Sequence, residues 1–248
     1  MITSLKDLIG LKIAAIDDEI GKSKDFYFDD VGWNIRYLVV DTGKFILGRK
    51  VLISHYSFKQ PDPQMNVLPL NLTVEKIKSS PHIDKKMPVS RQKEMELAMY
   101  YQWPFYWMNM TAIPAQESTL LRNMWTQEAI DEKNKHRSVL ETHLRSYDEI
   151  KGYSVHAISE DIGHVDDFLV DDKTWKIRYL VLDSSKWLPG TENKLISPAW
   201  IENVDWTRNQ INVDQEPEVI KNSPPYDKNA NIEPEYEIEL FKHYGKSN

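Results

Sequence analysis

The stretch DDVGWNIRYLVVD at residues 29–41 returns as DDKTWKIRYLVLD at residues 171–183. The match widens without a gap to residues 10–45 and 152–187, where 17 of the 36 paired residues are identical. Two unrelated segments would share far fewer residues. The chain therefore contains an internal duplication, and each copy is expected to fold as one structural unit.

The duplicated segment covers about a hundred residues in each copy, which is close to the usual size of one domain. After a one-residue insertion, residues 52–54 match residues 195–197, and residues 94–101 align with residues 237–244. The residues between the copies have no counterpart. We predict three parts, namely a first repeat with a C-terminal helix at 1–102, an aromatic-rich and helical linker at 103–145, and a second repeat with a C-terminal helix at 146–248.

The composition is that of an ordinary soluble globular protein, with 41% hydrophobic and 28% charged residues. No apolar run approaches the roughly 18 residues that a membrane span needs. Residues 1–7 lack the charged and apolar regions of a signal peptide. Because the chain has no cysteine, disulfides and thiolate metal sites are excluded. We expect a cytoplasmic protein without a transmembrane segment.

The two copies differ in charge. Residues 1–102 carry a net charge of +2 and residues 147–248 a net charge of −9, within a total of −7. Neither copy is basic enough to bind nucleic acid electrostatically, so no direct nucleic-acid partner is expected. Drift of surface charge between duplicated domains explains the difference. The alternative is that the acidic copy repels nucleic acid and anionic membranes, or faces a basic partner.

Residues 22–28 and 33–41 are predicted to form a hairpin, because both stretches are rich in aromatic and β-branched residues. Strict alternation puts two sets of residues on opposite faces: Trp33, Ile35, Tyr37 and Val39 on a core face, and Asn34, Arg36, Leu38 and Val40 on a second, partly covered face. Five or six short strands per copy suggest a small closed barrel. Trp33 and Trp175 are expected to be buried at equivalent positions of the two cores.

The repeated arginines, Arg36 and Arg178, are predicted to lie at the margin of buried surface, where a carboxylate partner offsets their desolvation. A structural ion pair is favoured over an anion-binding site. The candidate partners are the repeated carboxylates Asp25 or Asp41 in the first copy and Asp167 or Asp183 in the second.

The chain lacks the sequence motifs of the common catalytic and cofactor sites. It contains no nucleophile elbow, phosphate-binding glycine loop or zinc-type histidine motif. The acidic turns at residues 17–19 and 159–161 lack the ligand spacing and central glycine of a calcium loop. No catalytic, cofactor-binding or metal-binding residue is predicted, and the protein is not expected to be an enzyme.

The repeated pattern resembles the PRC-barrel family, and over nearly its whole length the chain is similar to bacterial tandem PRC-barrel proteins. The resemblance is carried by a signature present in both copies: Gly21, Asp25, Asp29, Asp30, Trp33, Arg36 and Tyr37 in the first, and Gly163, Asp167, Asp171, Asp172, Trp175, Arg178 and Tyr179 in the second. It implies an all-β fold with added helices, in which two small six-stranded barrels are joined by a helical linker. The same barrel forms the cytoplasmic part of the photosynthetic reaction-centre H subunit and the C-terminal domain of a ribosome-maturation factor.

The linker contains the densest aromatic run of the chain, with Trp103, Phe105, Tyr106 and Trp107 as candidate partner-binding residues. The alternatives are that the run packs across the junction of the barrels or anchors the protein at a membrane interface. Residues 116–146 are predicted to be helical. We expect the barrels to pack as a pseudo-two-fold pair through the faces of Leu38 and Leu180, with the aromatic run and the linker helix covering the seam.

The leading hypothesis is a non-catalytic scaffold or adaptor that binds another protein, of unknown identity, through its tandem barrels. One alternative, by analogy with the H subunit, is a peripheral subunit or assembly partner of a membrane electron-transport complex. A role in ribosome assembly is less favoured, because the second copy is acidic. Homo-oligomerisation and peripheral membrane association remain open.

Overall fold

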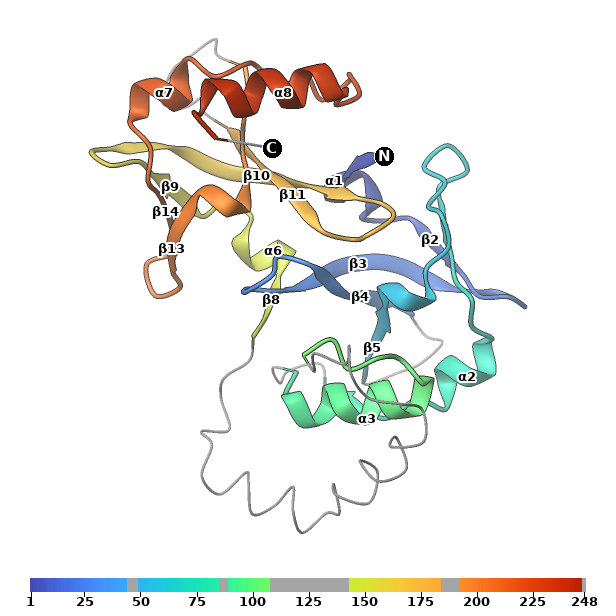
Figure 1. The fold of residues 1–248 in the computed structure, drawn as a ribbon. Coiled ribbons are helices and arrows are strands. Elements are labelled where there is room, and N and C mark those ends of the chain that lie inside the picture. Colours follow the sequence, from blue (N-terminus) through green and yellow to red (C-terminus); the bar gives the residue numbers. More distant parts are fainter. Residues whose placement is uncertain (44–48, 85–88, 108–142, 184–191, 247–248) are drawn as a thin grey trace, which may run out of the picture.

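The chain folds into two seven-stranded β-sheets, one for each repeat, with short helices around them (Figure 1). The computed structural model describes residues 1–43, 49–84, 89–107, 143–183 and 192–246. Most of the predicted linker helix at residues 116–146 lies outside the described residues, and its end was predicted wrongly, because residues 144–146 form a strand. The mostly β architecture agrees with the fold class predicted from the sequence.

The sheet of the first repeat has the strand order β6-β2-β3-β4-β5-β7. Its strands are β2 (Lys12–Ala14), β3 (Glu19–Asp29), β4 (Ile35–Asp41), β5 (Arg49–Ser54), β6 (Val67–Pro69) and β7 (Ile83–Asp84). Its helices are α1 (Leu5–Leu8), the 3-10 helix η1 (His55–Ser57), α2 (Val74–Lys78) and α3 (Arg91–Tyr101).

The sheet of the second repeat has the order β12-β11-β10-β9-β14-β13. Its strands are β9 (Ser154–His156), β10 (Asp161–Asp171), β11 (Ile177–Asp183), β12 (Lys194–Ile196), β13 (Ile201–Asp205) and β14 (Gln210–Val213). Its helices are α6 (Tyr147–Ile150), η2 (Pro198–Trp200), α7 (Pro217–Lys221) and α8 (Pro234–His243). In the described residues the last strand of each sheet does not pair with the first one. The hydrogen-bonded ring of the predicted closed barrel is therefore not complete in either sheet.

The two repeats exchange their leading strands. Strand β1 (Ile2–Ser4) precedes the first repeat but pairs antiparallel with β10 of the second. Strand β8 (Leu144–Ser146) precedes the second repeat but pairs antiparallel with β3 of the first. The pairings are equivalent, because Thr3 lies opposite Val170 and Arg145 lies opposite Phe28. Each sheet is therefore completed by a strand from the other repeat, in a pseudo-two-fold arrangement.

A bulge in each hairpin changes which side chains share a face. The register between β3 and β4 pairs Tyr27 with Tyr37 and then Phe28 with Ile35, so that Arg36 has no residue directly opposite. A bulge shifts the side-chain alternation by one residue. The prediction that put Ile35 on the face of Tyr37 was therefore wrong. The same shift recurs at Arg178 in the second repeat.

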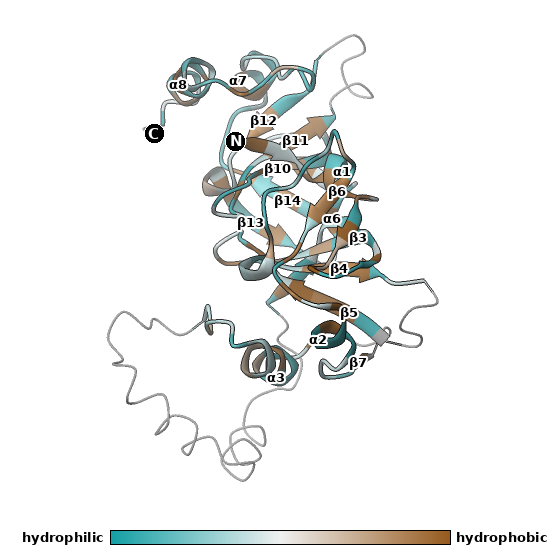
Figure 2. Cartoon of the chain, turned by 90° about the vertical axis from the view of Figure 1, so that its right-hand side faces the viewer, coloured by the Kyte–Doolittle hydropathy of each residue, from teal (hydrophilic) through white to brown (hydrophobic). Residues whose placement is uncertain are grey.

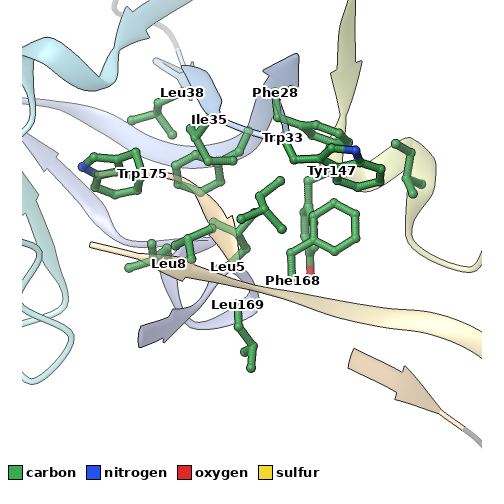
Figure 3. Close-up of a cluster of buried hydrophobic side chains, with 14 of the residues drawn as sticks. Leu5, Leu8, Phe28, Trp33, Ile35, Leu38, Tyr147, Phe168, Leu169 and Trp175 are labelled. Atoms are coloured by element: carbon green, nitrogen blue, oxygen red, sulfur yellow. The ribbon is translucent and has the colours of Figure 1, made fainter. Parts of the chain in front are cut away.

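The hydrophobic core is continuous across the two repeats (Figure 3). Trp33 and Trp175 are buried, as expected, but they lie where the repeats meet. The Trp33 ring is 6.1 Å from Phe168, and the Trp175 ring is 6.2 Å from Phe26, so each tryptophan contacts the opposite repeat. The core thus joins the repeats rather than dividing into two separate halves.

The backbone at the two tryptophans is held by a reciprocal exchange of hydrogen bonds. The Ile35 N–H donates to the Trp175 carbonyl, and the Ile177 N–H donates to the Trp33 carbonyl, both at 2.8 Å. Both tryptophans adopt left-handed backbone angles, with φ of 54° and 59°. A bulky residue holds that conformation only where its surroundings fix it. The contacts where the two repeats meet, here called the junction, supply that constraint.

Helices α3 and α8 lie at opposite ends of the molecule, away from the junction (Figure 2). Between them the stacked strands carry the hydrophobic residues, whereas the helices present mixed surfaces. The seam between the repeats is filled by the exchanged strands, α1, α6 and the two tryptophans. The prediction that the aromatic run covers this seam was wrong, because that run follows α3.

Candidate functional site

Two repeated aspartates fasten the exchanged strands. Asp25 accepts hydrogen bonds from the Ser146 hydroxyl at 2.6 Å and from the Asp148 N–H at 3.1 Å. Asp167 accepts the equivalent bonds from the residues at the start of α1, Ser4 and Lys6. Burial raises the pKa of both carboxyl groups above the ordinary value, because the charged form loses solvation. These aspartates form a reciprocal clasp and are not the partners of the arginines.

Removing the clasp should destabilise the whole chain. Asp167→Ala leaves four donors without their acceptor, including the buried Tyr147 hydroxyl, and should lower the free energy of unfolding by about 2–3 kcal/mol. Denaturant unfolding of the full chain measures the loss. Asp166→Ala is the matched control, because its more exposed ion pair with Lys6 should contribute only about 0–1 kcal/mol. Equal losses for the two variants would contradict the clasp.

The repeated glycines of the signature and its aspartates in the hairpin turns determine the shape of the hairpins. Gly21 has φ of 144°, and a Cβ there would lie 2.1 Å from the Asp41 carbonyl oxygen, so only glycine fits. Gly163 has φ of 134°. Asp29 accepts hydrogen bonds from turn N–H groups, and Asp171 does the same in the second repeat. These positions are structural.

The repeated arginines form ion pairs, but with other partners than those predicted. Arg36 Nε lies 2.8 Å from Asp29 Oδ2, and Arg178 Nη2 lies 3.0 Å from Glu237 Oε1. The bulge explains the difference, because it takes each arginine out of the regular alternation on which the predicted pairs depended. Asp30 instead pairs with Arg145 at 3.1 Å, and Asp172 accepts a hydrogen bond from Gln60.

A second repeated cluster fixes the C-terminal helices and was missed by the sequence reasoning. Tyr179 Oη donates to Glu237 of α8 at 2.6 Å. In the first repeat Glu94 of α3 is almost fully buried, lies 3.1 Å from Arg91 and accepts a hydrogen bond from Tyr106 at 2.6 Å. The alignment of residues 94–101 with 237–244 contained the signal, since a glutamate opens both segments.

The free energy of unfolding should decrease as pH rises, because of Glu94. Burial raises the pKa of its carboxyl from 4.5 to about 7. The folded state therefore holds this proton more tightly than the unfolded state. The protonated Glu94 carboxyl contributes about 3 kcal/mol at most to the free energy of unfolding. This contribution is fully present below pH 4.5 and is lost as pH rises through 7. Glu94→Gln should remove this dependence in denaturant unfolding between about pH 5 and about pH 8. Glu96→Gln on the same helix controls for loss of one charge. An unchanged slope in Glu94→Gln would disprove the assignment.

The aromatic run packs within the first repeat. Trp103 is buried, stacks on Tyr101 at 4.2 Å and donates from Nε1 to the Ser57 hydroxyl at 2.8 Å. Tyr106 lies under the Arg36 guanidinium at 3.9 Å, and Arg91 lies 4.3 Å from the Trp107 ring. Phe105 is partly buried against the core. Trp103 is therefore unavailable to a partner in this structure, and the run contacts α3 rather than the junction.

Two equivalent grooves lie beside the junction, one on each side of the pseudo-two-fold axis. The larger groove has a volume of about 730 Å³ and lies between the turn at residues 30–33, η2 and β13. The smaller groove has a volume of about 480 Å³ and lies between the equivalent turn at residues 172–175 and residues 55–60. Trp33 lines the first groove and Trp175 the second. These grooves are the candidate interaction sites.

Neither a metal cluster nor a membrane-spanning helix is found in the described part of the chain. Among these residues no three His, Asp or Glu side chains are grouped to hold a metal ion. In the acidic turn, Asp17 accepts the Val74 N–H and Glu19 pairs with Lys12. Of the helices in the described ranges, none has the length and apolar character needed to cross a bilayer.

Comparison with known proteins gives one family. The model of the PRC-barrel domain matches the chain twice, at residues 3–69 and 143–220, which together make up more than half of its length. The first match takes in most of β1 and the second takes in all of β8, and each continues through the hairpin and the strands up to β6 or β14. No curated protein sequence matches the chain.

Proposed function

Because the chain belongs to the PRC-barrel domain family, we propose that it is a non-catalytic scaffold or adaptor that binds another protein through its joined repeats. PRC-barrel domains are commonly protein-interaction modules. A fold alone does not determine function, so the proposal depends on the surface of this chain.

The observation that carries the proposal is the larger groove, which has a volume of about 730 Å³ and lies beside the junction of the repeats. The signature residues are engaged in the clasp, the turns, the junction and ion pairs within the fold. The two grooves differ in their walls, because Phe58 contacts Trp175 in the smaller groove whereas Ile201 stands at the equivalent position of the larger one. A groove whose walls combine aromatic and apolar side chains with polar and charged ones is a suitable protein-binding site.

The test is affinity capture with the tagged full chain from host extract, before and after membranes are removed. A protein partner must be recovered, identified and shown to bind the purified chain directly. Recovery of the chain alone from both fractions, or turnover of a small molecule by the purified chain, would contradict the proposal. A partner found only with membranes would favour the electron-transport alternative, and recovery of ribosomal RNA would favour a role in ribosome assembly.

A further inference from the structure

Each β-sheet has two outer edges, and one edge of each is covered within the described part of the chain. In the first repeat β7 pairs with β5. In the second repeat the bridge between Asn193 and Tyr226 flanks β12, and the Tyr244 hydroxyl donates to the Leu195 carbonyl of β12 at 3.2 Å. An uncovered edge can take up a strand from another protein, so the two remaining edges decide where this chain can do so.

The two remaining edges are equivalent but differ at one position. They are residues 58–62 in the first repeat and β13 in the second. The bridges between residues 58 and 70 and between residues 62 and 67 correspond to the pairs 201 and 213 and 205 and 210. Pro61 therefore stands where the second repeat has Val204. Because proline has no N–H to donate, the first edge is protected against an added strand, whereas β13 is not.

The backbone of Val204 points away from β14. In the first repeat Asp62 and Val67 exchange both of their N–H···O bonds, at 2.9 and 3.0 Å. The equivalent pair of the second repeat closes the ladder of β13 and β14 at its turn. Hydrogen-bonded and non-hydrogen-bonded pairs alternate along an antiparallel ladder, so the next pair, Val204 and Ile211, is non-hydrogen-bonded. The N–H and the C=O of Val204 therefore face outward, and neither has a hydrogen-bond partner among the described residues.

Strand β13 is one wall of the larger groove. Residues 201–204 line the groove on this side, and the turn at residues 30–33 and the start of β11 at residues 176–178 line it as well. An extended segment of a partner fits beside β13 in this groove. The edge strand of a second copy would bring its own sheet against the turn and β11. The groove therefore favours an extended segment over self-association.

The side chains of β13 indicate the composition of that segment. Val204 is partly buried and packs against the core, whereas Asn203 beside it is exposed. Successive residues of a strand point to opposite faces, and a residue paired with Val204 shares its face. The exposed charges that line the groove here, Lys176 and Glu202, have opposite signs. A neutral segment with an apolar residue opposite Val204 and polar residues beside it therefore fits best.

We propose that β13 binds an extended segment of a partner protein, which lies in the larger groove as an added strand and exchanges N–H···O bonds with Val204. This site deepens the proposed function and rests on it. In strand addition the main-chain hydrogen bonds supply affinity, and alternate side chains supply specificity. The apolar residue of the segment lies on the core side beside Val204, and the residues next to it face solvent.

The test uses the full chain and a capped peptide, acetyl-Ser-Thr-Val-Thr-Ser-amide. This peptide is neutral, and its central valine can pair with Val204. The control is the same peptide N-methylated at that valine, which cannot donate to the Val204 carbonyl. Binding is followed in NMR spectra by the amide N–H of Val204 and by the methyl signals of the peptide.

Two variants of the chain separate the backbone of Val204 from its side chain. Val204→Pro copies Pro61 and removes the N–H, and because the first repeat holds proline at the equivalent position the variant should fold. Val204→Ala keeps the N–H and is the matched control. The N-methylated peptide probes the same pair of bonds in the wild type, so the test does not depend on the folding of Val204→Pro.

The wild-type chain should bind the peptide with a saturable shift of the Val204 amide. N-methylation of the peptide and Val204→Pro should each weaken binding roughly tenfold or more, because the paired hydrogen bonds are lost, whereas Val204→Ala should retain it. An unresponsive Val204 amide, equal affinity for both peptides, or equal loss in the two variants would overturn the proposal. A wild-type dimer in which the Val204 amide is already protected from exchange would assign the edge to a second copy and would also overturn it.

The same variants separate this site from the proposed function. An identified partner that binds wild type and Val204→Pro equally would leave the scaffold function standing and refute β13 as its site. Peptide binding at Val204 without any protein partner would support the site and contradict the scaffold function. Loss of the identified partner in Val204→Pro but not in Val204→Ala would support both.

Discussion

Replacing Trp33 with alanine should lower the free energy of unfolding by about 3–5 kcal/mol, and Trp175→Ala should cost a similar amount. The loss is large because each ring is buried at the junction and contacts both repeats. Trp33 touches Phe28 of its own hairpin at 5.1 Å and Phe168 of the other repeat. Removing the ring therefore leaves a cavity in the core that the repeats share.

Denaturant unfolding of the full chain measures this loss. Trp206→Ala is the control, because Trp206 is only partly buried and should cost clearly less. Trp33→Gly adds a second comparison: since glycine accepts a positive φ, it should be less destabilising than alanine by roughly 1 kcal/mol. A loss below about 1 kcal/mol for both Trp33→Ala and Trp175→Ala, or free access of solvent quenchers to both native rings, would refute the shared core.

Cutting the chain within the linker should give two halves that fold only together. Residues 1–107 alone lack β8, which completes their sheet, and residues 143–248 alone lack β1. Each half would also expose its tryptophan and the apolar junction to water. On association each half supplies the strand that the other lacks and covers the apolar surface of the other. Mixing the halves should therefore restore both sheets and the cooperative unfolding of the intact chain.

Sedimentation and circular dichroism of the separate and mixed halves provide the measurement. A fragment that begins at residue 147 is the matched control, because it lacks β8 but keeps the remainder of the second repeat. This shorter fragment should bind the first half more weakly. Two halves that each fold alone, expose no apolar surface to a dye and do not associate would show that the exchange of strands is dispensable.

The sequence was sufficient to predict the duplication, the β class and the hairpins, but not the strand exchange. The reason is that Val170 and Phe28 occupy equivalent positions in the two repeats. Strand β1 could therefore pair with either repeat in the same register. Local pattern cannot distinguish pairing within a repeat from pairing between repeats, and only the assembled chain decides between them.

The partners of the repeated arginines were predicted wrongly, for a physical reason. A strict period of two residues cannot anticipate the bulge at Arg36, which moves Ile35 to the other face and changes the partner of the arginine. The residues shared by the two copies also do not reveal the grooves. The walls of the grooves differ between the copies, because Ile201 stands where the first repeat has Phe58.

The exchange of strands also bears on how the two repeats can diverge. A symmetric dimer of one repeat would place every substitution in both grooves at once, so that filling one groove would fill the other. A single chain that carries both repeats releases this constraint, because residues 58 and 201 are then separate positions in one gene product. Tandem fusion thus permits the two grooves to change independently of one another.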